Sequence, residues 1–197
     1  MPSCAPRRAH QDDAVTTTRP LLLLDVDGTI SPIPRQPGRT YPPDIEWKEV
    51  ARLAGEILVD ARLPGWLEKL SASYDFLWAT SWHEQANEIL SAPLGLPTDL
   101  PWIDFTAHHR NAERAEREVG CGKFGAVRAA LHSARRPAAW VDDDLSLAAI
   151  RWAHQRRIPT LFLPTTPNVG ITERHIERLE RWAAELSVDE REHRPCA

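Results

Sequence analysis

The segment Leu21–Ile30, LLLLDVDGTI, determines how the rest of the chain is interpreted. Its four leucines form a short apolar run, which is typical of a β-strand buried on both faces. Asp25 and Asp27 follow two residues apart, and residues i and i+2 of an extended chain face the same side. Gly28 comes next and marks a turn. The segment therefore predicts a buried strand over Pro20–Val26 that ends in two carboxylates directed at one point.

Strand-like and helix-like segments alternate along the rest of the chain. Four further strands are expected, at Tyr74–Ala79, Trp102–Phe105, Ala138–Val141 and Pro159–Leu163. Helices are expected at Pro64–Leu70, His83–Leu90, Lys123–Ser133, Leu145–Gln155 and Thr172–Leu186, the last with Thr172 as its N-cap. This alternation is typical of an open parallel sheet covered by helices on both faces. We therefore expect an α/β fold of three layers around a five-stranded parallel sheet.

The connecting segments predict one small additional element and otherwise loops. Trp47–Leu53 and Glu56–Asp60 are compatible with strands and flank Ala54-Gly55, which favours a small β-hairpin. The proline-rich segment Ser31–Pro43 is expected to be irregular. Asn111–Val119 alternates in charge, which is typical of a solvated helix or loop.

Composition indicates a soluble globular chain. Of its 197 residues, 42% are hydrophobic and 26% are charged. No apolar run approaches the ~20 residues that a membrane-spanning helix needs, and the first twenty residues lack the apolar block of a secretory signal. We therefore expect a cytoplasmic protein with no membrane partner. A single domain is expected over residues 20–187, between a disordered tail at 1–19 and a flexible tail at 188–197.

Charge and cysteine content exclude few other classes. The net charge of −4 provides no global attraction to nucleic acid, although a local basic groove can coexist with it. Cys4, Cys121 and Cys196 are odd in number and scattered, so they predict neither a disulfide framework nor a zinc site. His108 and His109, which precede Cys121, are interpreted as surface residues rather than zinc ligands.

Polar side chains follow three of the expected strands, at the edge where open parallel sheets bind ligands. They are Asp25 and Asp27 after the first strand, Thr80 and Ser81 after the second, and Asp142–Asp144 after the fourth. Carboxylates this close repel one another unless a cation lies between them, and an oxygen-lined pocket suits a hard divalent cation such as Mg²⁺. We therefore expect a magnesium site at this edge of the sheet.

The same edge is suited to a phosphoryl group. Lys123 opens a helix, so its ammonium and the helix N-terminus can both face the pocket, and Thr80 adds a hydroxyl. With a metal, these groups suit the oxygens of a transferring phosphoryl group. One carboxylate can attack phosphorus while its neighbour protonates the leaving oxygen.

Four segments carry a resemblance to a known family. LLLLDVDGTI resembles the first motif of the haloacid dehalogenase (HAD) superfamily, a strand followed by D-x-D-G-T. LWATS resembles the second motif, Lys123 in GKFGAV the third, and AAWVDDD the fourth. The four segments occur in the order of the family and span roughly residues 20–145. The resemblance implies a HAD-like Rossmannoid fold.

The resemblance also implies a role for each matching residue. Asp25 would be the nucleophile that forms an aspartyl-phosphate, and Asp27 would be the general acid and base. Thr80 and Lys123 would bind the phosphoryl oxygens. Magnesium would be held by Asp25, the backbone carbonyl of Asp27, and Asp142 or Asp143. Candidates for substrate binding at the same rim are Gly28, Thr29, Ser81 and Trp82.

The stretches between the motifs leave room for the hairpin but for no large cap domain. For a capless member, the resemblance implies an enzyme that acts on large substrates or relies on a partner to close the site. The segment WATSWHEQAN also resembles HAD domains associated with RNA repair.

Three functions fit this resemblance. The first is a magnesium-dependent phosphomonoesterase whose substrate is a phosphorylated small molecule or macromolecular end. The second is a nucleic-acid-end or nucleotide phosphatase, which predicts basic residues near the rim, with Arg35, Arg39 and Arg110 as candidates. The third is a non-catalytic HAD-like binding module, which is disfavoured by the intact set of Asp25, Asp27, Thr80, Lys123 and Asp142.

Five residues have two interpretations each. Thr80 is favoured over Ser81 as the residue that faces the site, because one of the two can cap the following helix. Asp144 is favoured as the N-cap of the next helix rather than as a metal ligand. Trp47 and Trp82 are equally suited to stacking on a nucleobase and to packing in the core.

Overall fold

We analysed a computed structural model of the chain, which describes residues 19–33, 40–53, 56–105 and 123–192. The tail expected at 1–19 therefore lies outside the described residues except for Arg19, and Asn111–Val119 lies wholly outside them. Within the described part of the chain, no helix is both long and apolar enough to span a membrane.

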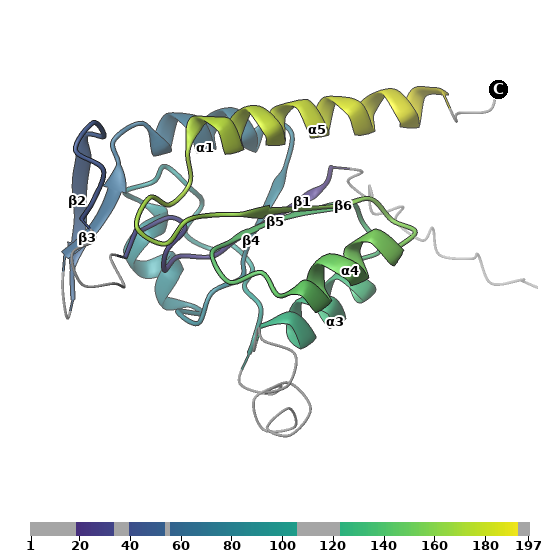
Figure 1. The fold of residues 1–197 in the computed structure, drawn as a ribbon, viewed down its shortest axis with the longest axis horizontal. Helices are drawn as coiled ribbons and strands as arrows, with labels where there is room; N and C mark the ends of the chain where they lie inside the picture. The colour runs from purple at the N-terminus through teal and green to yellow at the C-terminus, as the bar shows by residue number, and fades with distance from the viewer. Residues whose placement is uncertain (1–18, 34–39, 54–55, 106–122, 193–197) are drawn as a thin grey trace, which may run out of the picture.

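A parallel sheet of four strands forms the centre of the molecule (Figure 1). The strands are β1 (Leu21–Leu24), β4 (Asp75–Trp78), β5 (Ala138–Asp142) and β6 (Thr160–Pro164), in the order β4-β1-β5-β6. β1 pairs with β4 on one side and β5 on the other, so its backbone is bonded on both edges. All four of its leucines are buried, as the apolar run predicted.

The expected fifth strand is present only as one bridge. Trp102 pairs with Trp78 at the edge of β4, and no strand forms over Trp102–Phe105. The N–H of Trp78 donates to the carbonyl of Pro101, and Ile103 donates to the carbonyl of Trp78. Pro101 has no N–H of its own, so it cannot donate a further bond to the ladder. The prediction of five strands is thus wrong for the described residues.

Helices cover both faces of the sheet (Figure 1). On one face lie α1 (Leu63–Ser71) and α5 (Glu173–Glu192), and on the other lie α3 (Phe124–Ala134) and α4 (Leu147–Gln155). Leu22 and Leu24 of β1 belong to the core beneath α1 and α5, whereas Leu21 and Leu23 belong to the core beneath α3 and α4. Alternation of side chains along a strand places them on opposite faces. The expected three-layer α/β arrangement is therefore present.

Two of the expected helices, those at His83–Leu90 and Thr172–Leu186, differ clearly from the structure. The helix expected at His83–Leu90 is instead a π-helical turn, η1, at Asn87–Ser91. Its Asn87 accepts from the indole of Trp78 and donates to the carbonyl of Leu100, and these bonds fix the segment to β4. The helix α5 (Glu173–Glu192) continues past Leu186 and ends at Glu192.

The N-cap of α4 is Ser146, not Asp144. The Ser146 hydroxyl accepts from the N–H of Ala149, and its backbone is extended, as a cap requires. Thr172 directly precedes α5 as expected, and its carbonyl accepts from Ile176.

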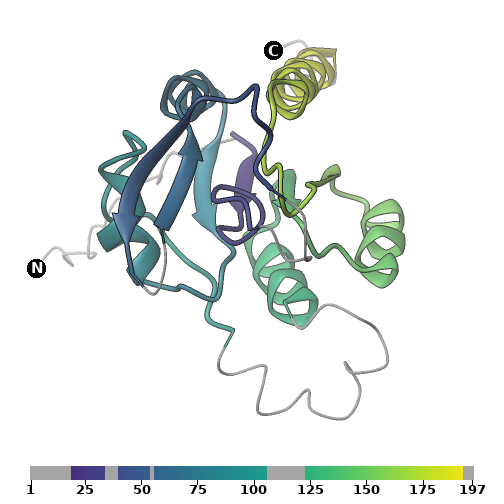
Figure 2. The same cartoon turned by 60° about the vertical axis from the view of Figure 1, so that its left-hand side comes forward.

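The expected hairpin is present as β2 (Trp47–Arg52) and β3 (Glu56–Asp60), paired antiparallel in a sheet of their own. Figure 2 shows it on the side of the molecule away from α3 and α4. Trp47 packs beside Tyr41, with 5.4 Å between ring centroids, and its indole donates to the carbonyl of Pro42.

Candidate active site

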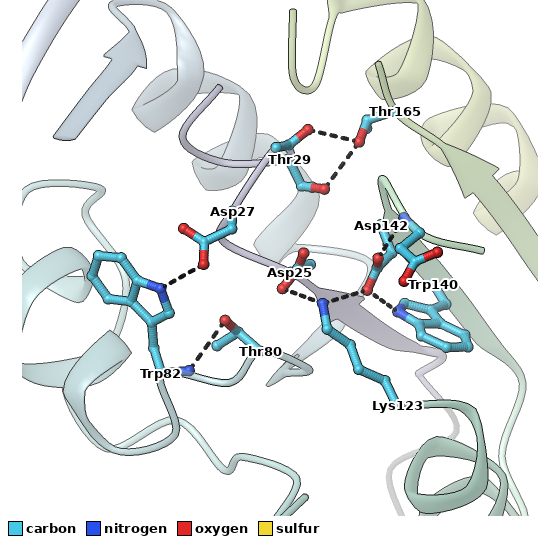
Figure 3. A network of polar contacts seen from close by, with 11 residues as sticks. Asp25, Asp27, Thr29, Thr80, Trp82, Lys123, Trp140, Asp142 and Thr165 are labelled. Atoms are coloured by element: carbon cyan, nitrogen blue, oxygen red, sulfur yellow. Dashed lines mark hydrogen bonds and ion pairs between the residues drawn. The ribbon is translucent and has the colours of Figure 1, made fainter. Parts of the chain in front are cut away.

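The polar residues at the carboxyl ends of β1, β4 and β5 lie together at one edge of the sheet (Figure 3). Asp25 follows β1 directly, and its N–H donates to the carbonyl of Val141 in β5. Thr80 lies two residues beyond β4, and Asp142 is the last residue of β5. These positions follow from parallel pairing, because it brings the ends of neighbouring strands to one edge.

Three carboxylates form a group that could hold a divalent metal. Asp25, Asp142 and Asp143 each offer an oxygen, and these oxygens lie within 4.8 Å of one another. Asp25 and Asp142 are only 1% and 0% exposed. The Oδ2 atom of Asp25 is buried and accepts no hydrogen bond from the described residues, which leaves an oxygen available to a cation. An all-carboxylate set of this kind fits a hard divalent cation.

Lys123 supplies the positive charge that the structure provides to this group. Its Nζ lies 2.7 Å from Asp25 Oδ1 and 3.1 Å from Asp142 Oδ2. Burial and the charge of Asp142 raise the pKa of Asp25 to about 7, although Lys123 opposes the change. Burial lowers the pKa of Lys123, but Asp25 and Asp142 outweigh it, so its pKa is raised overall. The single charge of Lys123 is shared between the carboxylates of Asp25 and Asp142, so a further cation would be stabilised beside them.

Asp142 is held by three donors. Besides Lys123, the indole Nε1 of Trp140 donates to its Oδ2 at 3.1 Å, and the N–H of Asp144 donates to its Oδ1 at 2.9 Å. Trp140 is fully buried in β5, two residues before its partner. This spacing was visible in the sequence, because residues i and i+2 of a strand share a face. The rigid support indicates a preformed ligand position.

The carboxylate of Asp27 points to a different neighbour. It is half-buried, it lies outside the group of three carboxylates that could hold a metal, and its Oδ2 accepts from the indole Nε1 of Trp82 at 3.1 Å. The backbone N–H of Trp82 also lies 3.4 Å from the hydroxyl of Thr80. Thr80 is 1% exposed, whereas Ser81 is exposed, so Thr80 is the residue on the inner side. The side chain of Trp82 is therefore half-buried and hydrogen-bonded to Asp27, rather than deeply buried or fully exposed.

Gly28 and Thr29 shape the loop that carries Asp27. Gly28 has φ +77°, and a Cβ there would lie 2.4 Å from Asp143 Oδ2. The buried hydroxyl of Thr29 lies 3.0 Å from that of Thr165, which in turn donates to the carbonyl of Gly28 at 2.9 Å. The Thr29 side chain thus binds protein rather than facing outward to substrate. Thr165 was not identified from the sequence, since no motif marks it.

Several sequence candidates lie outside the described residues. They are the basic residues Arg35, Arg39 and Arg110, and the zinc alternatives His108, His109 and Cys121.

The fold and the site together define a HAD-type domain. The sheet is parallel, an aspartate pair follows β1, a threonine follows β4, a lysine precedes α3 and aspartates lie at the end of β5. Residues 21–176 match the family described as the HAD domain in Swiss Army Knife RNA repair proteins, and the chain belongs to this family. Comparisons with curated proteins and with solved structures gave no match.

Proposed function

We propose that the protein is a magnesium-dependent phosphomonoesterase in which Asp25 is the nucleophile and Asp27 the general acid and base. The observation that carries the proposal is the different surroundings of these two carboxylates. Asp25 lies against Lys123, at 2.7 Å, and beside the other two acidic residues of the metal-binding group. Asp27 lies outside that group and accepts from a neutral indole. One carboxylate is thus suited to attack beside a cation, and the other to proton transfer.

The reaction would proceed in two balanced steps. A carboxylate oxygen of Asp25 forms a bond to phosphorus while the bond to the leaving oxygen breaks, and Asp27 gives that oxygen its proton. Water then attacks the aspartyl-phosphate while Asp27 takes a proton from it, which releases phosphate and restores both carboxyl groups. Lys123 and Thr80 would bind the phosphoryl oxygens.

Magnesium would be held by Asp25, Asp142 and Asp143, with the backbone carbonyl of Asp27 as the further ligand that the family resemblance implies. A bound cation would offset the charge of these carboxylates and of the phosphoryl oxygens. The partnerless Oδ2 of Asp25 supports this assignment.

A phosphatase screen with and without Mg²⁺ tests the proposal, with Asp25→Asn as the paired variant. The panel would hold p-nitrophenyl phosphate, nucleotides, sugar phosphates, phosphopeptides, and RNA oligonucleotides with a 5′ or a 3′ phosphate. We expect metal-dependent hydrolysis in the wild type and none in Asp25→Asn, with both proteins equally folded by circular dichroism. Retained activity in Asp25→Asn would exclude it as the nucleophile.

A second candidate substrate is the phosphorylated end of a nucleic acid. The description of the family as a domain of RNA repair proteins favours it. If this candidate is correct, kcat/KM for an end-phosphorylated RNA should exceed that for p-nitrophenyl phosphate, and its KM should rise with salt, because phosphate contacts release counterions. Equal kcat/KM values for RNA and for small esters would exclude a preference for nucleic-acid ends and favour a general phosphomonoesterase. Mg²⁺ binding, seen as a rise in Tm, without hydrolysis of any substrate would favour a binding module.

A further inference from the structure

Trp82 makes a contact that the two-step reaction above does not use. Its indole Nε1 donates to Asp27 Oδ2 at 3.1 Å, and its backbone N–H lies 3.4 Å from Thr80 Oγ1. Asp27 and Trp82 are 55 positions apart in the chain. One residue therefore connects the loop after β1 to the loop after β4, and both loops carry proposed catalytic groups (Figure 3).

The indole is the side-chain donor that the described part of the structure gives to the Asp27 carboxylate. Lys123, the nearby cation, bonds to Asp25 and Asp142 instead. Without the indole, the Asp27 side chain could rotate among its staggered conformers. A general acid must lie within hydrogen-bond distance of the oxygen it protonates, so a free rotation would reduce its efficiency.

The position of the indole is itself fixed. Its ring packs against the core that contains Leu22 and Leu24. The next residue, His83, has φ +50°, an uncommon backbone conformation for a non-glycine residue, and its N–H donates to the carbonyl of Thr80. The His83 ring contacts Trp102 at a centroid distance of 5.1 Å. The sharp turn from Thr80 to His83 is thus anchored on both sides, and it presents the indole toward Asp27.

We propose that Trp82 is a positioning residue, whose indole N–H holds the Asp27 carboxylate in the orientation from which it protonates the leaving oxygen. This inference rests on the function proposed above. It replaces the two sequence interpretations of Trp82, stacking on a nucleobase and packing in the core, by a role in proton transfer.

The test compares two substrates that differ in their need for a proton. The leaving group of p-nitrophenyl phosphate departs readily as an anion, whereas the alkoxide of glycerol 2-phosphate requires protonation. Trp82→Phe keeps an aromatic ring, removes the N–H donor and makes the side chain smaller, a change in size that the control variant below shares. We expect kcat/KM for glycerol 2-phosphate to fall about tenfold or more, and that for p-nitrophenyl phosphate to fall less than about threefold, with KM nearly unchanged.

Trp47→Phe is the matched control. It makes the same substitution and also removes an indole hydrogen bond, here to the carbonyl of Pro42 in the hairpin region. Both substrates should be hydrolysed by this variant at the wild-type rate. Trp82→His, which retains a ring N–H, should recover part of the lost glycerol 2-phosphate activity and serves also if Trp82→Phe folds poorly.

Any of three results would overturn the inference. One is an equal loss of kcat/KM for both substrates, or no loss, in a folded Trp82→Phe protein. Another is a further loss when Trp82→Phe is added to Asp27→Asn, because a residue that acts through Asp27 has no effect once the acid is gone. The third is a rise in KM alone, which would show instead that the ring binds substrate. Failure of the proposed function is distinguished by Asp25→Asn: if that variant keeps the wild-type activity, the error lies in the nucleophile and not in Trp82.

Discussion

The site contains two bonds from an indole to a carboxylate, and the two regions around them differ. Trp140 donates to Asp142 and Trp82 donates to Asp27, each at 3.1 Å. The first pair is fully buried within one strand, and Asp142 has two further donors in Lys123 and a backbone N–H. The second pair is half-buried and joins two loops.

The difference shows how one donor group can serve two purposes. On the Asp142 side, several redundant bonds hold a carboxylate rigid, which suits a ligand that must keep its place around a cation. On the Asp27 side, one neutral donor orients a carboxylate that remains accessible, which suits a group that gives and takes a proton. The predictions below test whether the two regions can be separated experimentally.

Substituting the two aspartates should give the largest effects and separate them most clearly. Asp142→Asn should reduce Mg²⁺ affinity and activity together, because it removes a charge from the metal-binding group. Asp27→Asn should lower kcat by about a thousandfold while leaving the Mg²⁺-induced rise in Tm intact. Isothermal titration with Mg²⁺ and steady-state kinetics measure both. Loss of Mg²⁺ binding in Asp27→Asn would make its side chain a metal ligand.

Gly28→Ala should have the next largest effect, on the metal side of the comparison. The added Cβ would lie 2.4 Å from Asp143 Oδ2, so that carboxylate must move, and Mg²⁺ affinity should fall about tenfold or more. Gly95→Ala is the control, because Gly95 has φ +70° but nothing within 4 Å of a Cβ. Both variants carry the backbone strain, about 1–2 kcal/mol, but only Gly28→Ala should weaken Mg²⁺ binding. Equal Mg²⁺ affinities would contradict the collision.

Trp140→Phe should have a smaller effect, and it should change the stability of the protein rather than its leaving-group preference. Asp142 keeps Lys123 and the Asp144 N–H as donors, so its place is largely retained. The buried ring loses its N–H and part of its volume, which should lower the free energy of unfolding by about 1–3 kcal/mol. Urea denaturation measures this loss. A change in leaving-group preference, as expected for Trp82→Phe, would erase the distinction between the two pairs.

The smallest effect concerns pH. Because burial and Asp142 raise the pKa of Asp25 to about 7 from 3.8, ionising it costs more in the folded chain than in the unfolded chain. The metal-free protein should therefore lose stability between pH 4 and about 7 through this group. A bound cation offsets the loss, so the rise in Tm on adding Mg²⁺ should be larger at pH 7.5 than at pH 5, by about 2–5 °C. Asp25→Asn should remove most of this pH dependence; an unchanged dependence would assign it to another group.

The sequence predicted those parts of the fold that depend on local patterns. The strands β1 and β5 lie within two residues of their expected limits, because buried parallel strands consist of uninterrupted apolar runs. Their ends place Asp25 and Asp142 at one edge, so these residues could be grouped before the structure was known.

Other features depend on contacts between distant residues, and no local pattern records them. The partner of Trp82 lies 55 residues away, and Thr165 lies 136 residues from Thr29. The choice of Ser146 over Asp144 as N-cap depends on where the helix begins, since α4 starts at Leu147 and both side chains can accept the bond. The fifth strand is missing because, within Trp102–Phe105, only Trp102 forms a bridge to β4.

The bonds of Thr165 have a consequence for synthesis of the protein. The loop that carries Asp27 is fastened by Thr165, and the carbonyl of Thr29 accepts from the N–H of Ile171. The loop is therefore synthesised early, whereas Thr165 and Ile171, which bond to it, are synthesised late. The hairpin β2–β3 pairs residues close in sequence and can form as it leaves the exit tunnel, whereas the loop that carries Asp27 cannot complete its bonds until Ile171 has emerged. A nascent chain that ends between Asp143 and Thr165 would carry every aspartate of the candidate site and still lack the bonds that hold the Asp27 loop.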